Sequence, residues 1–428
     1  MTVNLFNLKS RGTTLRTELL AGATTFLTAA YIIFVQPDIL AVTGMDKGAL
    51  TTITCLSTAL ATLLVALWAN APLMMAPGMG LNAFFAFSLV IGQKVPWQTA
   101  LGVVFLSGAL FFILTLVGLR ERLVKAIPLS LRLATSSGIG LFIAFIGLSN
   151  LGLIVKGDAI PLKLGPLSPT VLCGLVGLIL ALWLENRRIR GAIFLSILAT
   201  SLLGMLCGLS PWPTALFALP PSPAPLLLQL DILGALTLSL WANILTFMFV
   251  DLFDSLGTLI ATCREADLTD EEGEIAGLPR LLATDALATM GGALLGTSTT
   301  TTYIESASGI AEGGRTGLTA LTTATLFLLA LFFTPLIAAI PPYATAPALI
   351  VVGLFMMRSI GQIDFYRFDE GGPAFLTFIL MPLSYSIATG LSFGFISYFL
   401  LKLFGGKGRE IDPFLIGIAI LSLISLIL

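Results

Sequence analysis

Long apolar runs recur along the whole chain, and they constrain its fold more than any other feature. Runs of about 18 or more residues with few charges are typical of helices that cross a lipid bilayer. Hydrophobic residues make up 57% of the sequence and charged residues only 11%. The polar connections between the runs are too short for a soluble domain. We therefore expect an all-α polytopic membrane protein, with residues 1–428 forming one integral membrane domain.

The apolar runs number about fourteen. The stretch 373–404 is long enough for two short passes that separate near Gly390, and the path of the last run stays open. The runs span residues 17–36, 50–69, 73–91, 97–118, 132–153, 166–185, 189–208, 236–262, 280–295, 298–311, 316–340, 344–360, 373–404 and 411–428.

The basic residues predict the orientation of the chain. Cytoplasmic loops of membrane proteins carry an excess of Lys and Arg. All the basic clusters fall on one side of the membrane if the N-terminus is cytoplasmic, which favours a multi-pass protein of the cell inner or plasma membrane. The clusters are Lys9, Arg11 and Arg16; Arg120, Arg122, Lys125 and Arg132; Arg187, Arg188 and Arg190; and Lys402, Lys407 and Arg409.

Two segments interrupt the apolar pattern in a similar way. MMAPGMGLNAFFAF occupies 74–87 and GTSTTTTYIESASGIAEGG occupies 296–314. They lie about 225 residues apart, and paired interrupted spans at matching places in two halves indicate a transporter site near the bilayer midplane. An odd number of spans in each half, seven here, would invert the second half relative to the first. The alternative is that both segments are polar loops.

The backbone of these interrupted spans needs hydrogen-bond partners. Irregular backbone cannot face lipid, because its N–H and C=O groups would be unpaired there. We therefore expect 74–77 and 298–302 to be extended and to hydrogen-bond one another.

Two aspartates lie inside one apolar span, NILTFMFVDLFDSLGT at 243–258. Asp251 and Asp254 are three residues apart and so share a helix face. A charged side chain near the bilayer centre costs about 2.5–3.5 kcal/mol on insertion scales, which makes intramembrane acids candidates for function. The alternative is a span end that surfaces into the acidic loop 263–274. Asp285 is a third intramembrane aspartate, which a structural role would also explain.

Glu305 follows the second interrupted segment, at the head of a short helix. The N–H groups there would stabilise its anion, and a purely structural N-cap is the alternative role. Asn82, just after Gly80, offers an amide that donates and accepts at once. We expect Asn82, Asp251, Asp254 and Glu305 to converge in one cavity.

Histidine is absent from the sequence, which removes the commonest metal ligand and proton relay. Any proton chemistry must therefore use carboxylates, and we expect no cofactor and no metal.

The sequence resembles the nucleobase–ascorbate transporter superfamily, and within it the AzgA-like branch of adenine, guanine and hypoxanthine permeases. The resemblance runs nearly end to end. A departure from the ascorbate and xanthine branch, ES in place of QN at 305–306, argues against xanthine, uric acid and ascorbate as substrates. The stretches that carry the resemblance are AGATTFLTAAYIIFVQP, APGMGLNAFFAF, FVDLFDSLGT, TTTTYIESASG and AEGGRTGLTA.

The resemblance implies two inverted seven-helix repeats, with spans 3 and 10 interrupted by short strands. It implies a core domain of about residues 17–118 and 236–340, a gate domain of about 119–235 and 341–428, and a homodimer formed through gate helices. Its functional implication is proton-coupled uptake of purine bases.

By motif, Gly80, Asn82, Asp251 and Glu305 correspond to substrate-binding positions, and Asp254 or Asp251 to the proton carrier. We expect Glu305 to bind the base, Asp251 to assist it, and Asp254 to carry the proton. The expected partners are a small purine base, a proton and the lipid bilayer, with no nucleic acid.

Two other functions stay open. One is a transporter of the same fold for sulfate or bicarbonate, against which the acids and the lack of a basic residue at the site argue. The other is an intramembrane aspartyl protease, which would need its aspartates on two helices and a GxGD signature. Asp251 and Asp254 share one helix, and that signature is missing.

Overall fold

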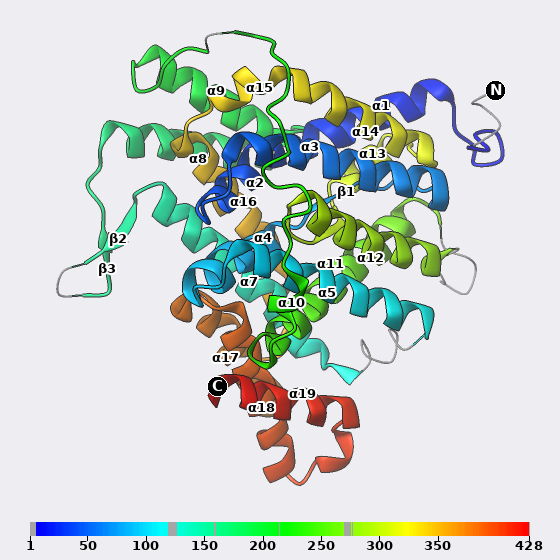
Figure 1. Cartoon of the computed structure of the whole chain (residues 1–428), viewed down its shortest axis with the longest axis vertical. Coiled ribbons are helices and arrows are strands. Elements are labelled where there is room, and N and C mark those ends of the chain that lie inside the picture. The colour runs from blue at the N-terminus through cyan, green and yellow to red at the C-terminus, as the bar shows by residue number, and fades with distance from the viewer. Residues whose placement is uncertain are drawn as a thin grey trace.

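The computed structural model describes residues 6–118, 126–157, 160–213, 215–268, 275 and 277–427. Helices dominate it, and most run side by side across Figure 1. The elements of the first half are α1 (Leu15–Ala29), α2 (Ile32–Ala41), α3 (Lys47–Leu64), a π-helix (Val65–Ala69), β1 (Met75–Pro77), α4 (Met79–Ala83), a second π-helix (Phe84–Gly92), α5 (Trp97–Leu116), α7 (Leu129–Asn150), β2 (Ile154–Lys156), β3 (Leu162–Leu164), α8 (Pro169–Asn186) and α9 (Ala192–Leu206).

The second half begins with a four-residue helix and ends with three helices that lie together at one tip of the molecule (Figure 1). Its elements are α10 (Ile232–Ala235), a 3-10 helix (Leu238–Leu240), α11 (Trp241–Glu265), α12 (Leu278–Leu295), β4 (Thr300–Thr302), α13 (Ser306–Ala311), α14 (Gly317–Ala330), a 3-10 helix (Leu331–Phe333), α15 (Thr334–Ala338), α16 (Pro342–Met357), a 3-10 helix (Arg358–Gln362), α17 (Phe368–Ser384), α18 (Ile387–Phe404), a 3-10 helix (Gly408–Glu410) and α19 (Pro413–Ile427).

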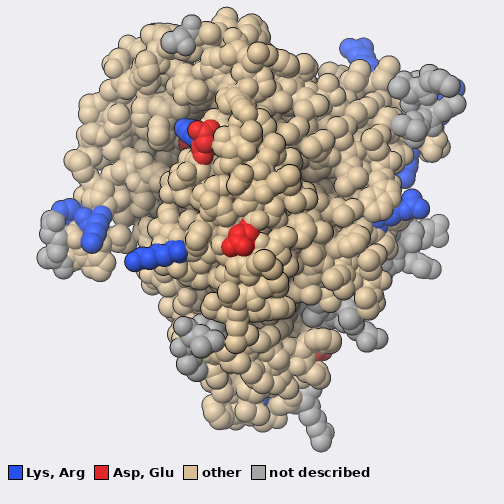
Figure 2. Space-filling view, viewed as in Figure 1, with Lys and Arg blue, Asp and Glu red and all other residues tan. Residues whose placement is uncertain are grey.

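The helices fit a membrane in length and composition. Within the described ranges, nine helical segments are long and apolar enough to cross one, and Met79–Gly92, Ala192–Leu206 and Pro413–Ile424 are shorter apolar helices. Figure 2 shows a face with few charged side chains, in which most of the visible Lys and Arg lie at the left and right margins. The chain is therefore an all-helical, multi-span membrane protein.

The helix ends follow from local sequence. Thr14, Asp46 and Ser168 precede α1, α3 and α8, and each side chain accepts a hydrogen bond from a first-turn backbone N–H. Such caps satisfy donors that have no partner within the helix. Asn70 (φ 48°) and Gly296 (φ 99°) adopt left-handed backbone just before the two interrupted segments, so they end the preceding helices.

Two groups of helices pack mainly among themselves. In one group, α1 and α3 pack on α14, α2 packs on α3, and α5 packs on α12. In the other, α7 packs on α16 and α17, and α8 packs on α9 and α16. The two pieces of each group come from the two halves of the chain.

The connection between α9 and α10 crosses the front of the molecule in Figure 1. Its backbone hydrogen-bonds to the first group of helices: Leu228 N donates to Leu294 O at 2.8 Å, and Asp231 N donates to Gln98 O at 2.9 Å. The connection is therefore fixed along the ends of α12 and α5.

The run 373–404 forms two helices, but they separate at a different place from the one predicted. The break lies at Tyr385 and Ser386 rather than near Gly390, because Tyr385 adopts left-handed backbone (φ 53°) and Ser386 caps α18. Gly390 lies inside α18, where its close approach to Thr377 O and Met381 leaves no space for a side chain. The last run forms α19, which packs on α18 and α11.

Two of the predicted basic loops lie at the same end of the bundle. Thr13 donates a hydrogen bond to Gly313 O, and Arg190 forms an ion pair with Glu312. The N-terminal segment and the loop before α9 thus meet at the end of α13. Arg120, Arg122 and Lys125 lie outside the described residues.

Candidate functional site

The two interrupted segments meet in the middle of the bundle. Strands β1 and β4 pair antiparallel, with Met75 opposite Thr302 and Pro77 opposite Thr300. The ladder continues past both ends, because Gly78 N donates to Thr299 O and Tyr303 N donates to Met74 O, each at 3.0 Å. The prediction that 74–77 and 298–302 are extended and hydrogen-bonded to one another is therefore confirmed.

Threonines from neighbouring helices satisfy backbone groups on the strands. The hydroxyl of Thr62 on α3 lies 3.1 Å from both the N and the O of Met75. The hydroxyl of Thr289 on α12 lies 3.3 Å from Thr300 N and 3.1 Å from Thr300 O. Buried backbone groups need such partners, and a threonine supplies a donor and an acceptor in one small group. Irregular backbone is stable here because each strand has one such threonine.

A cavity of about 90 Å³ lies where the strands end and the short helices α4 and α13 begin. Its wall combines hydroxyl and carboxyl groups with glycine and apolar side chains. The lining residues are Tyr31, Gly78, Met79, Gly80, Asp254, Thr258, Thr301, Thr302, Tyr303, Ile304, Glu305, Val352, Phe355 and Met356.

Glu305 reaches this cavity from the residue before α13. Its side chain does not cap α13. Instead, its Oε1 accepts a hydrogen bond of 2.7 Å from the hydroxyl of Tyr31. The carboxylate therefore turns toward the α1–α2 junction and the cavity rather than toward its own helix.

Asp254 and Asp251 share a face of α11 but have different neighbours. Asp254 lines the cavity. Asp251 is 1% exposed, and its Oδ2 lies 3.3 Å from the Thr289 hydroxyl, whose single proton it shares with Thr300 O. Since Thr289 also supports β4, Asp251 contacts the support of the strand, whereas Asp254 faces the open space.

Gly80 and Asn82 lie on α4. Gly80 lines the cavity, and a Cβ on it would lie 2.5 Å from Ile139 Cγ2, so a larger residue would separate α4 from α7. Asn82 is fully buried, and its Oδ1 accepts a hydrogen bond from the Ser298 hydroxyl. Asn82 thus binds the chain just before β4 and does not line the cavity.

The residues that were predicted to converge in one cavity therefore lie in two layers. Asp254, Glu305 and Gly80 line the cavity, while Asn82 contacts Ser298 just before β4 and Asp251 contacts Thr289 on α12. The sequence analysis did not single out Tyr31 or Tyr303. Tyr31 lies in the apolar stretch YIIFV, and its only signal is a hydroxyl in a run that otherwise lacks polar groups.

A second cavity, of about 370 Å³, adjoins the first between α7 and α11. Asp254, Thr258 and Met356 line both cavities. The second cavity extends toward Leu129 and Ile260, near the first turn of α7 and the last turns of α11. It provides a route from the site to the end of the bundle that carries the N-terminal segment.

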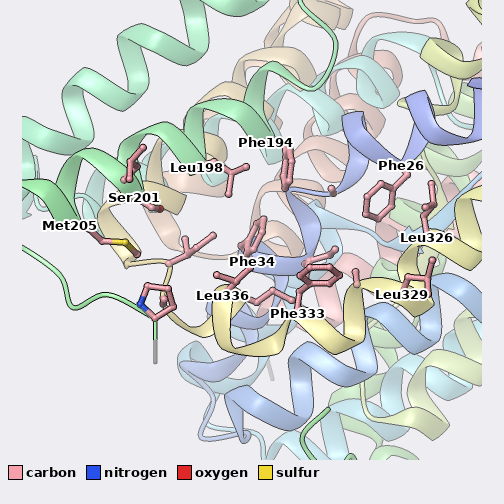
Figure 3. A pocket seen from close by; sticks show the side chains of 18 of the residues that line it. Phe26, Phe34, Phe194, Leu198, Ser201, Met205, Leu326, Leu329, Phe333 and Leu336 are labelled. Atoms are coloured by element: carbon pink, nitrogen blue, oxygen red, sulfur yellow. The ribbon is translucent and has the colours of Figure 1, made fainter. Parts of the chain in front are cut away.

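A third cavity, of about 600 Å³, has a different character (Figure 3). Phenylalanine and leucine side chains from α1, α2, α9, α14 and α15 line it, as Phe34, Phe194 and Leu336 show in Figure 3. Ser201 is a polar residue in this wall, and its hydroxyl already donates to Ile197 O. Most of this wall is hydrocarbon and none of the described carboxylates lines it, so the smaller cavity beside Glu305, with its hydroxyl and carboxyl groups, is the candidate site.

The described residues hold no group of three or more His, Cys, Asp and Glu side chains that could bind a metal ion.

Comparison with known proteins gives consistent results over the whole chain. Residues 16–393 match the model of the Permease family, Xan_ur_permease. The chain is 51% identical to the permease MJ0326 of Methanocaldococcus jannaschii, over 95% of this chain and 93% of that protein. It is 42% identical to the adenine permease AdeQ of Escherichia coli, over 99% and 96%. It is also 42% identical to the guanine/hypoxanthine permease PbuG of Bacillus subtilis, over 98% of each chain.

Solved structures share the fold at low sequence identity. The transmembrane domain of the cyanobacterial bicarbonate transporter BicA superposes with a TM-score of 0.65 at 16% identity, over 89% of this chain and 97% of that one. The full-length family match and the relatives above 40% identity decide the classification. The chain belongs to the Permease family, in its AzgA-like branch, and is a membrane permease rather than an enzyme.

Proposed function

We propose that this permease takes up purine nucleobases together with protons. The observation that carries the proposal is the cavity at the crossing of β1 and β4, which brings Asp254 and Glu305 to one small space inside the bundle. Full-length relatives named adenine permease and guanine/hypoxanthine permease support the substrate class.

Glu305 binds the base in this proposal. Purines carry ring N–H donors and are neutral and planar, so a carboxylate that accepts from them gives orientation as well as affinity. The Tyr31 hydroxyl uses Oε1, which leaves Oε2 to accept from the ligand. Gly80 keeps α4 close to the opposite wall, and Asn82 fixes Ser298 and so the strand beside the base.

Asp254 carries the proton. It lines both the site and the cavity that leads away from it, so a proton released there has a path out of the bundle. Asp251 assists by holding Thr289 against β4. A proton that moves down 100 mV supplies about 2.3 kcal/mol, enough for about fifty-fold accumulation of a neutral base.

The proposed architecture is a pair of inverted seven-helix repeats. The matched positions of β1 and β4, each with a supporting threonine on the second span of its half, support it. The core, about residues 17–118 and 236–340, would move against a gate of about 119–235 and 341–428. The two groups of helices that pack among themselves support this division.

We further propose that the N-terminus is cytoplasmic, in the inner or plasma membrane, and that two copies associate through gate helices. The clustering of Arg190 and the N-terminal segment at one end of the bundle supports this orientation under the positive-inside rule.

The BicA fold raises anion transport as a second function, since that protein transports bicarbonate. The charge of the site argues against it. The described residues that line the candidate cavity include Asp254 and Glu305 and no Lys or Arg, whereas an anion site needs positive potential.

Uptake by purified protein in lipid vesicles tests the proposal. Labelled hypoxanthine, adenine and guanine should accumulate when the vesicle exterior is acidic, and a protonophore should abolish the accumulation. Labelled sulfate and bicarbonate serve as competing substrates. Uptake of sulfate or bicarbonate without purine uptake would refute the proposed substrate class. Purine accumulation that does not depend on the proton gradient would refute the proposed proton coupling.

A further inference from the structure

Tyr31 lies at the junction of two helices and inside the candidate site. Helix α1 ends at Ala29 and α2 begins at Ile32, so Tyr31 lies at their junction, where the backbone keeps helical dihedrals (φ −57°, ψ −26°). Its side chain is 2% exposed, yet it lines the cavity. Its hydroxyl donates to Glu305 Oε1 at 2.7 Å, which joins the first span to the second interrupted segment.

We propose that Tyr31 is the residue that positions Glu305 for the base. The inference rests on the proposed function, because it assigns a part in purine binding to Tyr31, a side chain to which the sequence analysis gave no role. A glutamate side chain has three rotatable bonds, and fixing them on binding costs free energy. A hydrogen bond that exists before the ligand arrives removes part of that cost.

The hydrogen bond with Tyr31 is suited to this role. In the described part of the chain, it is the side-chain hydrogen bond that holds the Glu305 carboxylate. A bond between a hydroxyl and a carboxylate is about twice as strong as one between neutral groups, and 2.7 Å is a normal length for it. It engages Oε1, so Oε2 remains to accept from a ligand in the cavity that Glu305 lines.

A purely structural explanation of Tyr31 would be packing of the α1–α2 junction against α13. The structure offers a matched control for it, because a second side-chain contact joins the same two segments. The Thr28 hydroxyl lies 2.6 Å from the Ser308 hydroxyl, and this contact does not involve the Glu305 side chain. Thr28 and Ser308 do not line the candidate cavity.

Vesicle uptake of labelled hypoxanthine by Tyr31→Phe and Thr28→Val separates these explanations. Phenylalanine keeps the ring and removes only the hydroxyl, so the variant should fold, and thermal unfolding of both variants checks this. We expect Tyr31→Phe to raise KM about 10-fold or more with Vmax unchanged, because the lost hydrogen bond is to a charged group that binds the ground state. Thr28→Val should change KM less than about threefold.

Three results would overturn the inference. They are an unchanged KM in Tyr31→Phe, a lower Vmax at unchanged KM, and an equal rise in KM for both variants, which would indicate packing alone. The same experiment distinguishes this inference from the function on which it rests. A wild-type protein that takes up no purine would overturn both, whereas purine uptake with an unaltered Tyr31→Phe variant would overturn only the role of Tyr31.

Discussion

Replacing Glu305 with glutamine removes a negative charge from the candidate site and keeps the size of the side chain. Glutamine retains a carbonyl oxygen that can accept from the Tyr31 hydroxyl, so the existing 2.7 Å hydrogen bond need not be lost. The second oxygen becomes an NH₂ group. Where the carboxylate would accept from a ring N–H of the base, glutamine presents a donor to a donor.

The size of the effect follows from this change. A hydrogen bond to a charged group contributes about 1.5–3 kcal/mol, and its loss leaves the N–H of the base without a partner in a buried site. That free energy corresponds to a rise of about 10- to 150-fold in the Kd for hypoxanthine or adenine.

The assay is equilibrium binding of hypoxanthine to purified protein, with vesicle uptake measured in parallel. Asp254→Asn is the matched control, since it removes a charge from the same cavity. If Asp254 carries the proton, Asp254→Asn should bind hypoxanthine within about threefold of the wild type and lose accumulation driven by a pH gradient.

Either of two results would refute this reasoning. Wild-type affinity in Glu305→Gln would show that the base does not depend on this carboxylate. Normal pH-driven accumulation by Asp254→Asn would place the coupling proton on another group.

Two further predictions concern stability, and thermal unfolding of the purified protein checks both. Gly292→Ala should destabilise the fold by about 1–3 kcal/mol, because the new Cβ would lie 2.8 Å from Thr300 Oγ1 on β4, whereas Gly291→Ala meets open space and should be neutral or stabilising by up to about 1 kcal/mol. Equal effects of the two substitutions would contradict this packing argument. The second prediction concerns Glu410, whose pKa is held below its ordinary value by a 2.8 Å hydrogen bond from Lys402. A lowered native pKa stabilises the fold above the unfolded pKa, and the benefit is lost as pH falls through the native pKa. Glu410→Gln should therefore melt below the wild type at neutral pH, with a difference that shrinks as the pH falls below about 4.3. A difference that does not vary with pH would argue against the ion pair.

The interrupted segments could be predicted from the sequence because the residues that break the helices lie within the segments themselves. Proline, glycine and a run of threonines break a helix in a chain where lipid forbids unpaired backbone, so strand pairing between 75–77 and 300–302 was the remaining solution. The threonines that support the strands, Thr62 and Thr289, are indistinguishable in sequence from other threonines in apolar spans.

The different surroundings of Asp251 and Asp254 could not be predicted from the sequence. Their spacing places both on one face of α11, but two different neighbours share that face. Helix α12 brings Thr289 to Asp251, while the cavity opens at Asp254. Which acid faces the open space depends on the rotation of α11 between its neighbours, and that rotation is set by packing over the whole bundle.

Tyr31 and Tyr385 were missed for a related reason. Tyr31 lies at the α1–α2 junction with helical dihedrals, whereas Tyr385 ends α17 with left-handed backbone, and neither junction contains a glycine. Tertiary contacts hold these breaks: the Tyr31 hydroxyl bonds to Glu305, and Tyr385 O accepts from the Ser88 hydroxyl at 3.0 Å. Such tertiary contacts cannot be predicted from helical periodicity in the sequence.

The position of a bound purine tests the central claim most directly. A structure of the protein with hypoxanthine should place the base where β1 and β4 end, with a ring N–H within about 3.2 Å of Glu305 and Asp254 beside it. A base bound in the apolar cavity beside Phe194, or elsewhere out of hydrogen-bonding reach of Glu305, would contradict the account.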